Sequence, residues 1–130
     1  MNPELTLLAL SVVLGFVHIV LASHAASLQY GYRWNASARD EPMPPLKAVA
    51  GRLQRASRNF METFPFFAAA VLMVHALGRE SSLTWWGANL YFWSRVAYLP
   101  LYASGVFLIR SLVWNVGTVG IFLLLAALVF

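Results

Sequence analysis

The sequence predicts an all-α integral membrane protein, a four-helix bundle that forms one domain over residues 1–130. Hydrophobic residues make up 60% of the chain and charged residues only 11%, whereas a soluble domain typically has about 45–50% and about 25%. Four long apolar stretches alternate with polar connections, and each is close to the roughly 20 residues that a helix needs to cross a bilayer. The length allows one compact unit and no second domain.

The charge distribution favours a membrane protein over a nucleic-acid-binding protein. Nine Lys and Arg against five Asp and Glu give a net charge of +4, and six of the nine basic residues lie between Arg33 and Arg58. A concentration of basic residues in one connection is typical of a cytoplasmic loop. We therefore expect residues 29–51 in the cytoplasm, both termini outside, and no nucleic-acid partner.

The side chains available for chemistry are restricted. The chain contains no cysteine, which excludes disulfides, zinc–thiolate sites and a cysteine nucleophile. A thiol used in any reaction must therefore come from a ligand. His18 and His24 do not share a helical face, so we predict no metal site.

The first helix is expected at about residues 5–28, a stretch without a formal charge. It is too long for a cleaved signal peptide and has no basic region before it, so we interpret it as a retained span. The connection at residues 29–51 contains Pro42, Pro44 and Pro45, which exclude a continuous helix there.

The other three helices are expected at about residues 52–77, 83–102 and 106–130. The second begins with two basic turns and contains Pro65, where we expect a kink that a membrane helix tolerates. The third carries Trp85 and Trp86 near its start, as is common at a membrane interface. Only residues 103–105 separate the third helix from the fourth, so these two should be antiparallel neighbours.

Polar residues recur at helical spacing where a membrane helix normally has few. At 100° per residue, one stripe of the second helix carries charged and amide side chains, one face of the third carries an arginine among tyrosines, and a polar pair lies one to two turns into the fourth. The predicted cluster is Arg55, Arg58, Asn59, Glu62, Arg95, Tyr98, Tyr102, Arg110 and Ser111. Its four positive charges and one negative charge would complement a ligand with two carboxylates and one amine, because arginine binds carboxylates in a bidentate manner.

Each member of this cluster also has a structural interpretation. The arginines at the start of the second helix can extend to lipid headgroups. Glu62 and Arg95 can form an ion pair that joins the second helix to the third. The tyrosines can serve as packing or interface residues. The joint occurrence of these side chains is harder to explain in these terms.

Three motifs resemble the MAPEG family, the membrane-associated proteins in eicosanoid and glutathione metabolism. Arg58-Asn59-x-x-Glu62-x-x-Pro65, preceded by Arg52 and Arg55, is similar to the second-helix signature of that family. Arg95, followed by Tyr98 and Tyr102, resembles the third-helix segment of glutathione-using members. Arg110-Ser111 resembles the Arg-Ser pair that some members place beside the glutathione thiol. The resemblance extends over essentially the whole chain.

This resemblance implies a homotrimer with glutathione at each subunit interface near the cytoplasmic side. The residues implied to bind glutathione are Arg55, Arg58, Asn59, Glu62, Arg95, Tyr98 and Tyr102. Arg110, Ser111 and Tyr102 are implied to activate the thiol, which would attack a hydrophobic electrophile or hydroperoxide from the bilayer. We expect a bacterial-type member in the bacterial inner membrane, in contact with membrane lipids.

Two other functions stay open. The first is a non-catalytic lipid-binding protein, like the member of the same family that presents fatty acid without using glutathione. The second is a small transporter subunit or scaffold. Against the second, the chain shows no internal repeat and no pair of spans broken by Gly or Pro, which transporter sites often use.

Overall fold

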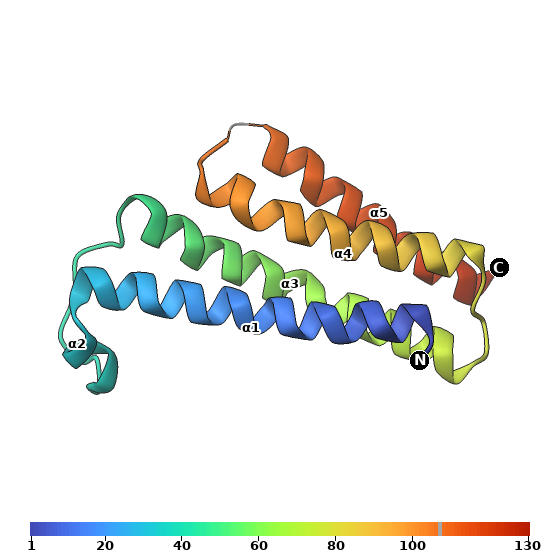
Figure 1. Ribbon diagram of the computed structural model, residues 1–130, viewed down its shortest axis with the longest axis horizontal. Helices are drawn as coiled ribbons and strands as arrows, with labels where there is room; N and C mark the ends of the chain where they lie inside the picture. The colour runs from blue at the N-terminus through green and yellow to red at the C-terminus, as the bar shows by residue number, and fades with distance from the viewer. Residues whose placement is uncertain (107) are drawn as a thin grey trace.

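The computed structural model describes residues 1–106 and 108–130, in which the regular secondary structure is helical and no strand occurs. The helices are α1 (Pro3–Tyr30), α2 (Tyr32–Ala36), α3 (Ala48–Ala76), α4 (Ser82–Ala103) and α5 (Ile109–Val129) (Figure 1). The all-α prediction is confirmed for the described residues. The four long helices follow the four predicted stretches, whereas the five-residue helix α2 lies inside the connection for which no helix was predicted.

Local capping explains why α1 extends beyond the predicted bounds at both ends. The Asn2 side chain accepts hydrogen bonds from the backbone N–H groups of Glu4 and Leu5, and Pro3 occupies the first turn. Both features are favoured at a helix start, where N–H groups lack partners within the helix. The helix ends at Gly31, whose φ of 94° is readily adopted by glycine.

The start of the last helix differs from the prediction of residues 106–130. Helix α5 begins at Ile109, directly after Leu108, whose φ of 68° lies in the left-handed region. Phe107, inside the predicted helix, lies outside the described residues. Arg110 and Ser111 therefore occupy the first turn of α5, and their expected depth of one to two turns was wrong. Helix α3 continues without a break through Pro65.

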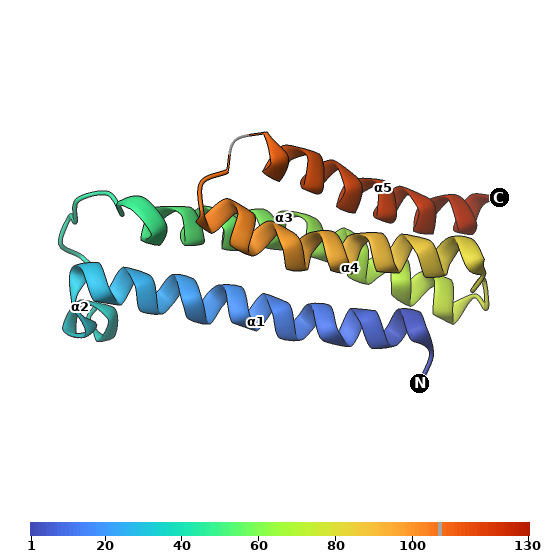
Figure 2. The same ribbon diagram turned by 45° about the horizontal axis from the view of Figure 1, so that its top comes forward.

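The long helices pack most extensively in two pairs, α4 with α5 and α1 with α3. Figures 1 and 2 show these pairs side by side, with the chain termini at one end of the bundle and α2 at the other. The prediction that the helices now called α4 and α5 are antiparallel neighbours is confirmed. At their crossing, a Cβ added to Gly87 would lie 2.7 Å from the Gly120 carbonyl oxygen. Small residues permit this close backbone approach.

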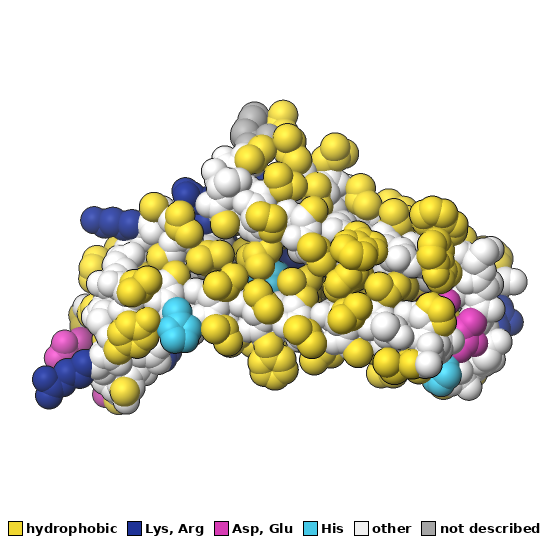
Figure 3. All heavy atoms as spheres, in the orientation of Figure 1, with side chains coloured by type: hydrophobic (Ala, Val, Ile, Leu, Met, Phe, Trp, Pro, Cys, Tyr) yellow, Lys and Arg dark blue, Asp and Glu magenta, His cyan; other side chains and the backbone are white. Residues whose placement is uncertain are grey.

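The buried core lies between α1, α3, α4 and α5 in the half of the bundle that holds the termini. Phe67 of α3 stacks on Tyr91 of α4 with ring centroids 4.0 Å apart, and Val71, Val74 and Leu124 are fully buried around them. The outside is also apolar: Figure 3 shows hydrophobic side chains over the middle of one face and basic side chains at the end with α2. Such a surface is suited to lipid contact.

Three of the long helices, α1, α3 and α5, are long and apolar enough to cross a membrane. Helix α4 is not among them, although its 22 residues exceed the 21 residues of α5. The reason lies in its sequence, which includes Asn89, Ser94 and Arg95 together with several Trp and Tyr residues. Ser94 and Arg95 are buried, so α4 places part of its polarity inside the bundle.

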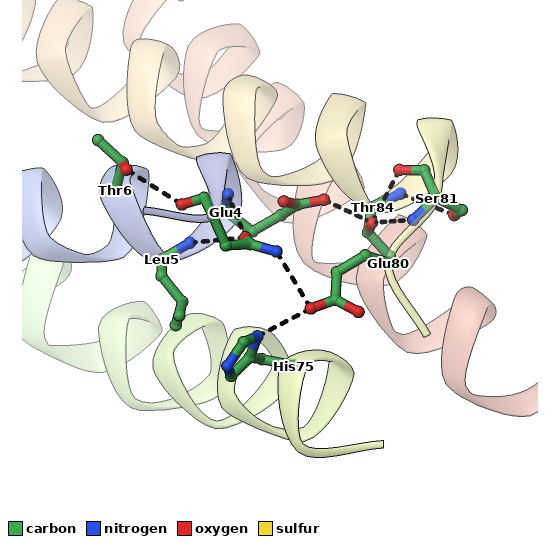
Figure 4. A network of polar contacts seen from close by, with 8 residues as sticks. Glu4, Leu5, Thr6, His75, Glu80, Ser81 and Thr84 are labelled. Atoms are coloured by element: carbon green, nitrogen blue, oxygen red, sulfur yellow. Dashed lines mark hydrogen bonds and ion pairs between the residues drawn. The ribbon is translucent and has the colours of Figure 1, made fainter. Parts of the chain in front are cut away.

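A polar network, which we call the end clasp, ties the helices together near the termini (Figure 4). Its residues are Asn2, Glu4, His75, Arg79, Glu80, Ser81 and Thr84. The Thr84 hydroxyl donates to the buried Glu4 carboxylate at 2.7 Å, which joins α4 to α1. Glu80 accepts from Asn2 and pairs with His75 at 2.8 Å. Arg79 donates to carbonyls at the end of α5.

Candidate functional site

The predicted polar cluster surrounds a cavity of about 230 Å³ near the end of the bundle opposite the end clasp. Seven of the nine predicted residues line it: Arg55, Arg58, Asn59 and Glu62 from α3, Tyr98 and Tyr102 from α4, and Arg110 from α5. Spacings of three and four residues place the α3 members on one face, as the sequence predicted. Three helices thus bring together side chains that are far apart in the chain.

Tyr102 contacts two of the three arginines that line this cavity. Arg55 donates a hydrogen bond from Nε to the Tyr102 hydroxyl at 3.0 Å. The Arg110 guanidinium lies 5.1 Å from the centroid of the Tyr102 ring, at cation–π distance. Tyr98 stacks on Tyr102 with ring centroids 5.4 Å apart. Tyr102 therefore holds Arg55 of α3 and Arg110 of α5 on the same cavity.

Arg95 lies behind the cavity wall and does not line the cavity. Its side chain is buried, and Nη1 donates to Asn59 Oδ1 at 2.8 Å. Its guanidinium also lies 4.4 Å from the Tyr98 ring centroid. Arg95 therefore fixes two residues of the wall. Its buried Nε and Nη2 have no hydrogen-bond partner among the described residues.

The structural alternative of a Glu62–Arg95 ion pair was wrong. The described residues contain one salt bridge, which joins His75 to Glu80 in the end clasp. Asn59, three residues before Glu62 on α3, takes the hydrogen bond of Arg95 instead. Glu62 is exposed at the cavity, where its carboxylate is available to a ligand.

Ser111 lines a second, adjoining cavity of about 340 Å³ that shares Asn59, Tyr98 and Arg110 with the first. Two residues of this cavity, Trp114 and Asn115, were not predicted from the sequence. Each follows a predicted residue by one helical turn, Arg110 and Ser111 respectively, and this i+4 spacing was the signal that could have identified them. The buried Trp114 indole N–H has no acceptor among the described residues.

Arg52, the first arginine of the α3 stripe, has a structural role. Its Nε donates to the Ala103 carbonyl at 2.8 Å. Ala103 is the last residue of α4, where carbonyl groups lack partners within the helix and carry partial negative charge. Arg52 thus joins the start of α3 to the end of α4 beside the cavity.

The charges of the first cavity determine which ligands it favours. Three guanidinium groups, from Arg55, Arg58 and Arg110, face one carboxylate, from Glu62. An excess of cations in a partly apolar environment needs anions. Within residues 1–106 and 108–130, no group of three or more His, Asp or Glu side chains is arranged to hold a metal ion.

Comparison with known proteins gives one match over nearly the whole chain. The model of the MAPEG family matches residues 7–130, which include all nine residues of the predicted cluster. No curated protein matches the sequence.

Proposed function

This chain belongs to the MAPEG family, and we propose that it is a glutathione-dependent transferase or peroxidase that acts on lipophilic substrates. Membership of this family, together with the three apolar helices, makes the chain an integral membrane protein. The family includes glutathione transferases and peroxidases as well as other members. Among these activities, we propose that of a glutathione transferase or peroxidase.

The observation that carries the proposal is the charge set of the 230 Å³ cavity. Glutathione has two carboxylates and one ammonium group, and the cavity offers three guanidinium groups and one carboxylate. Arg55 and Arg58 are placed to bind the carboxylates, since guanidinium groups match them bidentately. Glu62 is placed to accept the ammonium group. Asn59, held by Arg95, adds a polar side chain to the wall.

We infer that the reaction of the glutathione thiol takes place at the adjoining 340 Å³ cavity. Bound glutathione supplies the thiol that the cysteine-free chain lacks. A thiol has a pKa of about 8.5, and a nearby cation lowers it. Arg110 lines both cavities and is our candidate for that cation. Ser111 or Tyr102 donates a hydrogen bond that stabilises the thiolate, and Trp114 and Asn115 line the space for the second substrate.

Assembly and location are further parts of the proposal. We infer a homotrimer in the bacterial inner membrane, with residues 29–51 in the cytoplasm and both termini outside. The side chains of Arg55, Arg58, Glu62 and Arg110 are exposed in the single chain. A neighbouring subunit can therefore cover them and complete the site.

Glutathione binding to the purified protein in a neutral detergent, measured by titration calorimetry, tests the proposal. Arg55→Gln should weaken binding by roughly tenfold or more, the loss expected for one hydrogen bond to a charged group. Arg79→Gln, which removes a guanidinium at the opposite end of the bundle, is the matched control and should leave binding unchanged. Glu62→Gln should also weaken binding.

The absence of glutathione binding to folded wild-type protein at millimolar concentration would contradict the proposal. It would favour the alternative function, a non-catalytic lipid-binding protein of the same family. Equal binding by wild type and Arg55→Gln would show instead that glutathione occupies a different position.

The role of Arg110 has its own test. Arg110→Ala should raise the pKa of the bound thiol, because the cation that stabilises the thiolate is removed. The thiolate absorbance of the glutathione complex as a function of pH measures this pKa. An unchanged titration would remove Arg110 from the activating role while leaving glutathione binding in place.

A further inference from the structure

A larger cavity, of about 460 Å³, lies beside the candidate site, and we call it the loop cavity. It is an open cavity lined by the end of α1, helix α2, the connection that follows α2, and the start of α3. The lining residues that matter here are Tyr30, Trp34, Arg39, Glu41, Met43 and Arg55. Its volume is within the range of small-molecule binding sites, about 300–1,000 Å³.

The connection that forms one wall is fixed to α1 by hydrogen bonds. The Gln29 side chain donates to the Pro45 carbonyl at 3.1 Å and accepts from the Lys47 backbone N–H at 2.9 Å. The Tyr30 hydroxyl donates to the Pro44 carbonyl. These contacts, 14 to 18 residues apart in the chain, hold the wall in place.

Arg55 contacts both the loop cavity and the candidate site. Its Nε donates to Tyr102 in the candidate site. Its Nη1 lies over Gly51, which lines the loop cavity: a Cβ added there would be 3.2 Å from Nη1 and 2.9 Å from the Leu46 carbonyl oxygen. Glycine at position 51 therefore leaves room for the guanidinium at the boundary between the two cavities.

Arg39 is held over the same cavity by an unusual backbone conformation. Its φ of 60° lies in the left-handed region, which residues other than glycine rarely occupy and which is found at ligand clamps. Its Nη2 donates to the Asn35 side chain at 2.9 Å, and its guanidinium lies 4.6 Å from the Trp34 ring centroid. These contacts keep the charge of Arg39 at the cavity wall.

Trp34 presents an unused donor beside these cations. Its indole N–H is buried and has no hydrogen-bond acceptor among the described residues. An N–H group enclosed in this way is destabilising unless an acceptor meets it. Trp34 also lines the loop cavity, and a small rotation of its indole would bring this N–H to an acceptor bound there.

We propose that the loop cavity binds the anionic group of an amphiphile and shares Arg55 with the candidate glutathione site. Two guanidinium groups, of Arg39 and Arg55, face one carboxylate, of Glu41, which leaves a net positive charge. Trp34 and Met43 supply an apolar surface for the alkyl part. The anion is a carboxylate or a phosphate, carried either by a free amphiphile or by a membrane lipid. The site is independent of the proposed reaction apart from the shared Arg55.

Octanoate is a suitable probe, titrated into full-length protein in a neutral maltoside detergent, with octanol as the uncharged control. We expect saturable binding of octanoate and none of octanol. Arg39→Gln should weaken octanoate binding roughly tenfold or more, as for the loss of one hydrogen bond to a charged group. Lys47→Gln is the matched control, because it removes a positive charge from the same connection without lining the cavity. It should bind octanoate as wild type does.

A second variant and two further readouts complete the test. Trp34→Phe, which removes the indole N–H and keeps an aromatic ring, should weaken octanoate binding several-fold by the same reasoning. Glutathione binding should be unchanged in Arg39→Gln, whereas Arg55→Gln should weaken the binding of both octanoate and glutathione. Phosphatidylglycerol added to the micelles distinguishes the sources: competition with octanoate identifies a lipid phosphate, and its absence identifies a free amphiphile.

The proposal is overturned if wild type shows no saturable octanoate binding, if octanol binds as well as octanoate, or if Arg39→Gln and Lys47→Gln behave alike. Any of these results leaves the glutathione proposal standing, because glutathione binding is measured separately. Octanoate binding without glutathione binding would support the anion site in the loop cavity and contradict the glutathione proposal.

Discussion

The α4–α5 crossing provides the sharpest test of the packing, through Gly120→Ala. A Cβ at position 120 would lie 2.5 Å from the Gly87 carbonyl oxygen and 2.8 Å from the Tyr91 backbone nitrogen. Real Cβ contacts essentially never fall below 3.0 Å, so the two helices would have to separate by about 0.5 Å, the difference between 3.0 and 2.5 Å. Backbone atoms cannot move away by rotating a side chain.

The energetic cost follows from this separation. Overpacking of this kind costs about 1–3 kcal/mol, and the higher helix propensity of alanine returns up to about 1 kcal/mol. We therefore expect Gly120→Ala to lower the free energy of unfolding by up to about 2 kcal/mol. It should also weaken glutathione binding, because moving α5 away from α4 displaces Arg110 from its position 5.1 Å from the Tyr102 ring.

Gly117→Ala on the same helix is the matched control. The one close contact of its added Cβ is the Ser94 hydroxyl oxygen at 2.6 Å, with other atoms at 3.7 Å or more. Ser94 can rotate away at the cost of its hydrogen bond to the Tyr91 carbonyl, about 1 kcal/mol, which the helix propensity of alanine offsets. Unfolding by titration with dodecyl sulfate measures both variants. Equal stability of the two would refute the packing argument.

Two further predictions concern the opposite ends of the bundle. Tyr102→Phe should weaken glutathione binding by up to roughly tenfold in calorimetry, because Arg55 loses the hydroxyl that positions it; a variant that binds as tightly as wild type would show that Arg55 is placed by other contacts. The pKa of the Glu80 carboxyl is lowered below its usual 4.5 by its own backbone N–H and by the hydrogen bond with His75, so its contribution to stability is present above pH 4.5 and is lost as the pH falls through the lowered value. Thermal unfolding between pH 6 and pH 3 should therefore show a steeper loss of stability for wild type than for Glu80→Gln, and parallel curves would contradict this.

The sequence carried enough information to predict most of the fold. Apolar length marked the long helices, and the prolines at positions 42, 44 and 45 marked the connection after α1. The sequence did not predict the start of α5, because that start depends on the left-handed backbone of Leu108. An apolar stretch gives no signal for a single residue of this kind, since Leu is also a good helix former.

Helical spacing predicted which residues would share the site, but not which of them would touch. Arg95 meets Asn59 and not Glu62, although both α3 residues lie on the predicted stripe. The sequence spacing determines the direction in which a side chain points around its own helix. The residue that it meets on the neighbouring helix depends on how the two helices pack. Spacing places Trp114 and Asn115 on the same face of α5 as Arg110 and Ser111, but only the packing of the helices shows that this next turn also lines the cavity.

The end clasp has a mechanical consequence for the bundle. Its contacts tie α1, the α3–α4 turn and α4 to one another at the end with the termini (Figure 4), and Arg79 joins that turn to α5. At the other end, helices α3 and α4 are joined by single contacts such as those of Arg52 and Arg55. The contacts of the end clasp therefore cross-link all four long helices at the end away from the cavities, and the cavities are lined at the opposite end by side chains of α3, α4 and α5.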